Sequence, residues 1–416
     1  MTKKIKVLVV PSDHSGVGYF RSTKPHLHLD KLFPDEFHID IDYSPRLDND
    51  EWLKQYDIIH YHRTLGDYEQ METLNQRLKY LGIISIMDLD DYWLPDINHP
   101  AYHTIKNNNL HTKIRNNVRF AENVTTTTSI FANEIKKINK NVTVIPNAID
   151  PTDKQYICNP EPSNKIRVGW LGGSSHLADL KLLNNLVSKL KSSKLLDKIQ
   201  FVICGFDTRG KITMTNSDTG EKTQRDIKPH ETVWVQYEKI FTNNYQSISP
   251  AYKEHLNRFV KEEFIGIENE PYRRVWTKDV NNYASNYNLF DISLAPLVEN
   301  KFNYVKSQLK VIESGFHKKA LIAQNFGPYT LDIETARQKG GEIDLNKNGL
   351  LVDSNKNHKS WFQHIKKLVD NPEMIGILGE NLHKTVSEKY SLDTVTKNRA
   401  KYYKTLINKK NGIFNV

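Results

Sequence analysis

The sequence predicts an α/β protein built from two doubly wound parallel sheets. Short apolar runs such as Ile5 to Val10 and Ile166 to Trp170 are each followed by a glycine-containing turn and a helical pattern. Runs of this kind are typical of parallel strands that are buried on both faces. The alternation starts again after a proline-containing linker at Asp150 to Lys165, and 416 residues suit two domains of ordinary size.

Composition indicates a globular protein with a mildly basic surface. Lysine and arginine exceed aspartate and glutamate by nine charges, which permits a polyanionic partner without requiring one. The two cysteines, Cys158 and Cys204, have no paired spacing, so we expect neither a disulfide framework nor a metal knuckle. The basic N-terminus leads into an apolar run that is too short for a signal peptide, and we find no transmembrane segment. We therefore expect a cytoplasmic protein, and the oligomeric state stays open.

The first domain is expected at residues 1–155, with helices between its strands. One long helix is expected at Tyr102 to Arg119 and a shorter one at Ser129 to Lys137. The strands are expected at Phe37–Ile41, Asp57–Tyr61, Ile83–Met87, Val124–Thr128 and Val142–Ile145, in addition to the first one.

Polar residues follow several of these strands, where open α/β sheets bind their ligands. Gly16 and Gly18 precede Arg21 in the loop after the first strand, and glycines at such a junction let a ligand approach the backbone. The third glycine of a dinucleotide fingerprint is missing. His62 follows another strand, and the pair Asp90 and Asp91 follows the next. These residues could orient sugar hydroxyls or could simply cap loops and form turns.

The second domain is expected at residues 165–390. Residues 205–277 interrupt its rhythm, so we expect an insertion there, with a hairpin that turns at Asn216 to Gly220. The aromatic residues that follow are interpreted as core packing rather than as a stacking platform. We expect helices at Leu177–Leu190, Lys359–Val369, Pro372–Lys389 and Leu392–Ile407, and strands at Ile199–Cys204, Ala320–Ala323 and Gly349–Asp353.

A glycine turn opens this second domain. Gly172, Gly173 and Ser174 stand between a strand and the start of a helix. Glycines remove side chains from the turn, and a serine can cap or donate, so the geometry suits a phosphate.

A second cluster of anion-binding residues occurs between Asp291 and Gly327. An apolar strand is stopped by Pro296, and a helical pattern follows from Val305. Lysines, a hydroxyl and a positive helix end meet there, with a glutamate on the same helical face. The residues concerned are Lys306, Ser307, Lys310 and Glu313.

This pattern resembles the GT-B glycosyltransferases of the large retaining family four, which includes sucrose synthases and many polysaccharide and mannosyl transferases. The segment from Glu313 to Ile322, ESGFHKKALI, is similar to the family's glutamate-containing donor segment. Pro146-Asn-Ala-Ile-Asp150 resembles the close of the family's N-terminal domain. The resemblance covers nearly the whole chain outside residues 205–277, and we expect a phage or bacterial member. Val305 stands where the family has its second carboxylate.

The resemblance implies two Rossmann-like domains, with the C-terminal helix at residues 391–416 packed on the first. It implies transfer from a nucleoside-diphosphate sugar, first of all a UDP-sugar, with retention and without any required cofactor or metal; the Asp-x-Asp metal motif belongs to another glycosyltransferase fold. Asp90, Asp91 and His62 are expected on the sugar and acceptor side as catalytic residues. The donor-binding residues implied are Gly16, Gly18, Arg21, Gly172, Gly173, Ser174, Lys306, Ser307, Lys310 and Glu313.

The acceptor is left open between a glycan or lipopolysaccharide and a modified base in double-stranded DNA, the latter being compatible with the net charge of +9. A different class of function also stays open. Because Val305 replaces a carboxylate, the chain could be an inactive GT-B-like protein that only binds a nucleotide or glycan.

Overall fold

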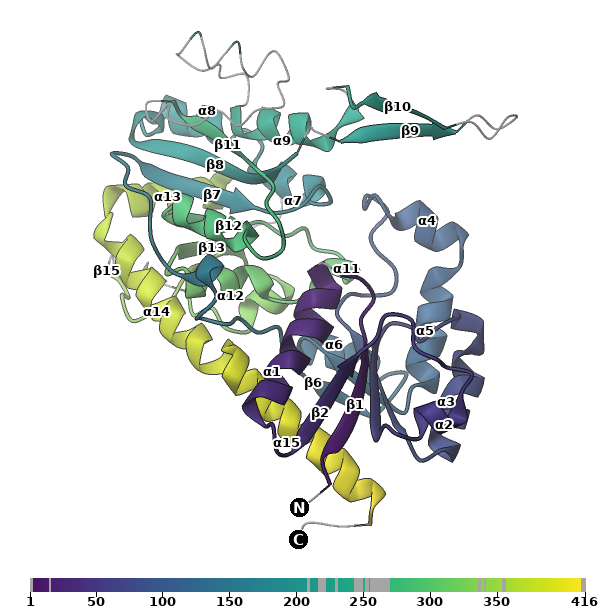
Figure 1. Ribbon diagram of the computed structural model, residues 1–416. Helices are drawn as coiled ribbons and strands as arrows, with labels where there is room; N and C mark the ends of the chain where they lie inside the picture. Colours follow the sequence, from purple (N-terminus) through teal and green to yellow (C-terminus); the bar gives the residue numbers. More distant parts are fainter. Residues whose placement is uncertain are drawn as a thin grey trace. The chain divides into compact units, whose positions relative to one another are not determined.

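The computed structural model describes residues 3–14, 16–207, 210–215, 222–228, 231–242, 250, 254, 270–335, 338–339, 342–353 and 357–412. They form two compact units (Figure 1). Unit 1 comprises Met1–Pro151, Asn300–Ile312 and Val386–Val416, and unit 2 comprises Thr152–Glu299 and Glu313–Thr385. Each unit contains a six-stranded parallel sheet.

Unit 1 has the strand order β2-β1-β3-β4-β5-β6. The chain leaves β1 toward one edge and then returns to build the other side, so the sheet has a topological switch point between β1 and β3. Its strands are β1 (Ile5–Val10), β2 (Phe37–Ile41), β3 (Ile58–His62), β4 (Ile84–Leu89), β5 (Asn123–Thr126) and β6 (Val142–Val144). Its helices are α1 (Lys24–Leu32), α2 (Asp50–Leu53), α3 (Met71–Tyr80), α4 (Tyr102–Asn107), α5 (Leu110–Phe120), α6 (Ser129–Ile135), α11 (Lys301–Tyr304) and α15 (Leu392–Lys410).

The sheet of unit 1 is buried on both faces, which explains why its strands are apolar without alternation. Val7 and Val9 face a core that includes Tyr403 of α15. Leu8 and Val10 face the opposite core, to which α3, α5 and α6 contribute. The C-terminal helix is joined to the rest of this unit by the backbone, because Leu392 N donates to Ile149 O at 2.7 Å.

Unit 2 has the strand order β11-β8-β7-β12-β13-β16, with its switch point between β7 and β12. The strands are β7 (Ile166–Leu171), β8 (Ile199–Phe206), β11 (Tyr272–Trp276), β12 (Ile292–Ala295), β13 (Ala320–Gln324) and β16 (Leu350–Val352). The helices are α7 (Leu177–Leu180), α8 (Leu186–Ser192), α9 (Val233–Thr242) and α13 (Lys359–Asp370). Two further helices, α12 (Leu309–Phe316) and α14 (Glu373–Tyr390), contain residues of both units.

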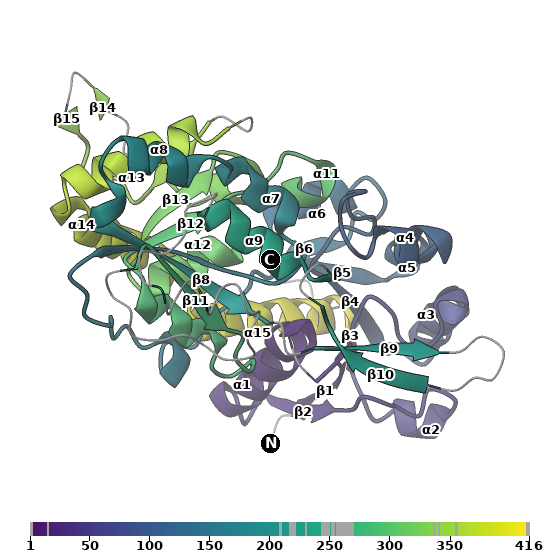
Figure 2. The same cartoon turned by 90° about the horizontal axis from the view of Figure 1, so that it is seen from above.

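Two hairpins complete unit 2. They are β9 (Lys211–Thr215) with β10 (Lys222–Asp226), and β14 (Gln338–Lys339) with β15 (Glu342–Ile343). Figures 1 and 2 show β9 and β10 as a ribbon separate from the parallel sheet. The strands of the first hairpin confirm the prediction, and its predicted turn lies outside the described residues.

The segment expected to be an insertion is partly integral to unit 2. β11 pairs in parallel with β8 inside the main sheet. Trp234 and Tyr237 of α9 belong to the main hydrophobic core. The sequence pattern did not indicate that α9 and β11 belong to the main sheet and core, because polar segments separate them from the regular strands. The interpretation of the aromatic residues as core packing holds for Tyr272, Trp276 and Tyr287, which are buried, while Tyr245 lies outside the described residues.

Three predicted helices are shorter or interrupted. Asn109 adopts a left-handed conformation with φ 54° and separates α4 from α5. Asn185, with φ 69°, ends the turn that follows α7. Asparagine tolerates this conformation better than most residues, so both breaks have a local cause. The helix expected from Val305 begins only at Leu309.

Candidate functional site

A pocket of about 470 Å³ lies at the switch point of the sheet in unit 1. The loops after β1 and β3 line it, which is where an open α/β sheet places a ligand. Its polar side chains include a carboxylate, a guanidinium, two phenols and two hydroxyls. The lining residues are Val10, Pro11, Ser12, Asp13, Val17, Tyr43, His62, Arg63, Thr64, Gly66 and Tyr68.

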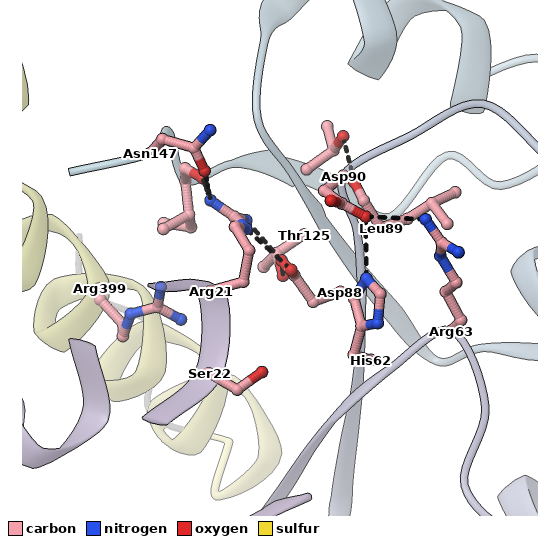
Figure 3. Close-up of polar contacts among 12 residues, drawn as sticks. Arg21, Ser22, His62, Arg63, Asp88, Leu89, Asp90, Thr125, Asn147 and Arg399 are labelled. Atoms are coloured by element: carbon pink, nitrogen blue, oxygen red, sulfur yellow. Dashed lines mark hydrogen bonds and ion pairs between the residues drawn. The ribbon is translucent and has the colours of Figure 1, made fainter. Parts of the chain in front are cut away.

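His62 is held in this pocket by a carboxylate from the next strand (Figure 3). Its Nε2 lies 2.9 Å from Oδ1 of Asp90, and Nη2 of Arg63 donates to the same oxygen at 3.2 Å. Arg63 has a positive φ of 59°, an uncommon conformation for a side chain of this size. Strained backbone of this kind clusters at ligand sites, and here it places the guanidinium against Asp90.

Asp90 and Asp91 are neighbours in sequence but differ in environment. Burial disfavours the charge of Asp90, but His62 and then Arg63 outweigh it, so the pKa of Asp90 lies below its ordinary value. Burial, followed by the charge of Asp90, raises the pKa of Asp91, although Lys306 opposes the rise. The Asp91 side chain is 38% exposed, and its Oδ2 lies 3.9 Å from Nη2 of Arg63. The two neighbouring carboxylates therefore have pKa values that are shifted in opposite directions.

Arg21 lies inside unit 1 rather than in the pocket lining. Its Nε and Nη2 donate to the two carboxylate oxygens of Asp88 at 2.9 and 2.6 Å (Figure 3). Its Nη1 donates to Ile145 O at 2.7 Å and to Asn147 Oδ1 at 3.2 Å. Burial would raise the pKa of Asp88, but Arg21 outweighs it and lowers that pKa. Arg21 thus ties the first helix to the ends of two strands.

Gly16 and Gly18 shape the loop between β1 and α1. Gly16 has a positive φ of 45°, and a Cβ on Gly18 would lie 2.1 Å from Asp13 O. Gly18 therefore permits a close backbone approach. Its N–H points toward Oδ2 of Asp13 at 3.4 Å, and Gly18 begins a π-helical turn that ends at Thr23.

The glycine turn of unit 2 follows β7. A Cβ on Gly172 would lie 2.4 Å from the Trp170 ring, so packing alone requires glycine at this position. A Cβ on Gly173 would meet nothing within 4 Å among the described residues. Gly173 and Ser174 are exposed. The open part of the turn is therefore its second half.

Glu313 of α12 lies in a phenol-lined interior of unit 2. Its Oε1 accepts a hydrogen bond from Tyr283, and its Oε2 accepts one from Tyr287 at 2.9 Å. Glu313 is 1% exposed. The Tyr156 hydroxyl extends this hydrogen-bond network, because it lies 3.3 Å from the Tyr283 hydroxyl.

The segment before α12 belongs to unit 1. Lys306 lies in the loop, with its ammonium 5.0 Å from the centre of the Phe302 ring, and Ser307 follows it. Lys310 is in the first turn of α12, and Lys306, Ser307 and Lys310 are all half-buried. Val305, where the resemblance to family four leads one to expect a second carboxylate, is fully buried in the core of unit 1.

Sequence reasoning missed several polar residues that the structure brings into these places. Tyr43 and Tyr68 line the pocket only because of loop folding, and no local signal identifies them. Asp13 follows β1 directly, so it could have been included with the other residues at strand ends. In unit 2, His176 and Asp179 are three residues apart just after the glycine turn, a spacing that puts both side chains on one face.

Within the described part of the chain, no group of three His, Cys, Asp or Glu side chains is arranged to hold a metal ion. A search of the same residues finds no helix that is both long and apolar enough to span a membrane.

The chain is similar to known proteins in structure but not detectably in sequence. No protein-family model and no curated sequence matches the chain. HepE of Anabaena, solved in complex with UDP and glucose, is 12% identical, with 96% of this chain and 100% of that chain covered and a TM-score of 0.57. A UDP-forming trehalose-phosphate synthase of Burkholderia vietnamiensis is 10% identical, with 96% of each chain covered and a TM-score of 0.54. A putative UDP-N-acetylglucosamine 2-epimerase of Listeria monocytogenes is 9% identical, with 98% of each chain covered and a TM-score of 0.51.

The chain has the GT-B fold. At sequence identities of 9–12% the similarity shows the fold alone. The function of each unit therefore has to follow from the residues at its own sheet.

Proposed function

We propose that this GT-B protein transfers a sugar from a nucleoside-diphosphate sugar to an acceptor hydroxyl, with retention of configuration. One observation carries the proposal: each sheet has an open, polar set of loops at its own switch point. In unit 1 these loops line the pocket at His62, and in unit 2 they form the turn at Gly173. Two separate ligand positions suit a reaction with two substrates.

The donor is assigned to unit 2. HepE has been solved with UDP-glucose, and a UDP-sugar is accordingly the first donor to test. The exposed second half of the glycine turn, Gly173 and Ser174, would offer backbone N–H groups to the diphosphate. Glu313, which also lies in unit 2, is proposed to bind the ribose of the donor. The assignment of Lys306, Ser307 and Lys310 to the donor stays a prediction from the sequence, because these residues belong to unit 1.

The acceptor is assigned to the pocket of unit 1, and its chemistry suits an uncharged sugar. Among the lining residues of this pocket, Arg63 is the permanent cation, and Asp90 pairs with it. The other polar side chains of the lining are His62, Asp13, the hydroxyls of Ser12 and Thr64, and the phenols of Tyr43 and Tyr68. This combination can bind sugar hydroxyls and stack on a sugar ring. A DNA backbone would require several cations at such a site.

In the proposed reaction the bond between the anomeric carbon and the diphosphate breaks, and the acceptor oxygen attacks from the same face. A donor phosphate oxygen accepts the acceptor's proton, so no side-chain nucleophile is needed. Stabilisation of the leaving charge is the main contribution required from the protein. Asp90, fixed by His62, and the more exposed Asp91 would orient the attacking hydroxyl.

The test is release of a nucleoside diphosphate from UDP-glucose and other nucleotide sugars in the presence of a panel of free sugars and glycans. Gly173→Leu should abolish release because the side chain fills the turn. Gly376→Leu is the matched control, because a Cβ there also meets nothing within 4 Å among the described residues. If no donor and acceptor pair yields a nucleoside diphosphate, the proposal of catalysis is wrong and a binding function remains.

The acceptor class is tested separately by binding to duplex DNA at two salt concentrations. Weak, salt-insensitive association is expected for a glycan-modifying enzyme. Affinity that falls by orders of magnitude between about 50 and 200 mM salt would instead indicate DNA as the acceptor.

A further inference from the structure

A histidine and an aspartate form an ordered pair directly after the glycine turn of unit 2. Nδ1 of His176 lies 2.8 Å from Oδ2 of Asp179, and the His176 side chain is 22% exposed while that of Asp179 is 6% exposed. The ring of His176 also packs edge-on against Trp170, with 5.9 Å between centroids. Two contacts therefore fix the ring, and Nε2 is directed away from Asp179 because the two ring nitrogens lie on different sides of the imidazole.

The backbone that carries His176 is fixed to the turn by a phenol. The Tyr237 hydroxyl donates to Gly173 O at 3.1 Å and accepts a hydrogen bond from His176 N at 2.9 Å. Tyr237 is buried, and it lies on α9. The same oxygen thus links the backbone of the open end of the glycine turn to the backbone of the histidine.

Asp179 also reaches the other side of the switch point. Its Oδ1 accepts a hydrogen bond from Val298 N at 2.8 Å, in the loop that follows β12. Asp179 thereby joins the loops after β7 and β12, which flank the position where an open sheet binds its ligand. A carboxylate that is held from two sides can fix the orientation of a histidine.

We infer that His176 contacts the diphosphate of the donor, with Asp179 as its positioning residue. This inference rests on the proposed function and adds a cation that the turn itself does not contain. Lys181 is the next basic residue along the chain, and it lies beyond α7. The imidazolium of His176 would donate from Nε2 to a phosphate oxygen and offset the negative charge that grows on the leaving diphosphate.

The test measures binding rather than turnover. UDP and uridine are titrated calorimetrically into the wild type and into His176→Gln, with uridine measured by competition. Loss of a charge-assisted hydrogen bond to phosphate should weaken UDP about tenfold to a hundredfold, whereas uridine should be weakened less than about twofold. His28→Gln is the matched control, because His28 Nε2 is likewise paired with a carboxylate, Asp393, at 2.6 Å.

Charge rescue separates a phosphate contact from a structural role. His176→Arg should restore most of the UDP affinity, because it again places a charged N–H donor beside the turn. Asp179→Asn should weaken UDP in the same direction as His176→Gln.

The outcomes separate the role of His176 from the proposed function of the whole protein. Equal loss of UDP and uridine in His176→Gln, or full UDP affinity in that variant, overturns the role of His176 and leaves the proposed function intact. If the wild type binds none of UDP, GDP and ADP, the proposed function fails and the inference fails with it.

Discussion

Arg21 and Asp88 form a bidentate ion pair inside unit 1, with contacts of 2.9 and 2.6 Å and with Arg21 only 3% exposed. Removal of one partner leaves an uncompensated buried charge. Arg21→Met should therefore lower the free energy of unfolding by about 3–5 kcal/mol, as measured by urea denaturation. Lys113→Met is the control, since Lys113 pairs with Glu69 on the surface and should change stability by less than about 1 kcal/mol. Similar values for both variants would contradict this assignment of Arg21.

Asp91 should control the acidic limb of the pH profile. Its pKa is raised, so acidification protonates it before Asp90, whose pKa is lowered. If the ionised form orients the acceptor, kcat/KM for the acceptor should fall as the pH drops through the raised pKa. Asp91→Asn should lower kcat/KM about tenfold to a hundredfold and flatten that limb, while hydrolysis of the donor by water stays unchanged. An unaltered profile in Asp91→Asn would rule out the role.

His60 should make unit 1 sensitive to acid. It is fully buried beside His26, and burial followed by the charges of Arg399 and Arg21 lowers its pKa well below the ordinary value. Burial, then Arg399, lowers the pKa of His26 in the same way. Because the folded state keeps both rings neutral, the unfolded chain binds more protons below about pH 6.5. The free energy of unfolding should then fall by up to about 1.4 kcal/mol per pH unit for each histidine.

His60→Leu tests this expectation. Among the described residues, neither ring nitrogen of His60 has a hydrogen-bond partner, so an apolar replacement leaves no broken bond. Urea titrations should give similar stability to the wild type at pH 7.5 and greater stability at pH 5.5. Equal losses in both proteins on acidification would show that other groups carry the effect. Asp88, another buried titratable residue near Arg21, does not account for this effect, because its pKa lies below the ordinary value of an aspartate.

Val305→Glu, which would introduce the carboxylate that the resemblance to family four predicts at this position, should unfold the protein. Val305 is fully buried in the core that also contains Leu65 and Trp93. Burial of an unpaired carboxylate there should cost about 4 kcal/mol or more. Val144→Glu is the control, because Val144 is 37% exposed. A Val305→Glu variant that is folded and as stable as the wild type would contradict the placement of this residue.

Glu313 can be tested at the ribose. If it accepts a ribose hydroxyl in addition to its phenols, Glu313→Gln should abolish the preference of the wild type for UDP over 2′-deoxy-UDP. The preference is expected to be about tenfold, the value of one hydrogen bond to a charged group. Glu380→Gln, on the exposed side of α14, is the control. A preference that survives in Glu313→Gln would show that the carboxylate serves only to hold Tyr283 and Tyr287.

The fold could be predicted because burial on both faces gives each parallel strand a continuous apolar run, as in Ile5–Val10 and Ile199–Phe206. The helix breaks at Asn109 and Asn185 could not, since they depend on single backbone conformations. β11 was hidden because Arg273 and Arg274 make it look polar; Arg273 pairs with Glu161, and Arg274 pairs with Glu238.

The candidate site was predictable only at strand ends. His62 and Asp90 follow neighbouring strands, so their 2.9 Å contact follows from the topology. Arg21 follows β1 as well, yet its direction into the interior depends on the π-helical turn that precedes α1. The amino-acid sequence alone does not show in which direction a side chain of such a turn points.

The hydrogen bond from Leu392 N to Ile149 O joins the last helix to a unit whose sheet is made much earlier in synthesis. Unit 1 contains residues that are made before unit 2 but is finished only by α15, whereas unit 2 needs no residue beyond Thr385. The unit that comes second in sequence is therefore the first to be available in full. Until α15 is made, the face of the first sheet that contains Val7 and Ile58 lacks the cover of Tyr403, and the nascent chain exposes it to chaperones or to aggregation.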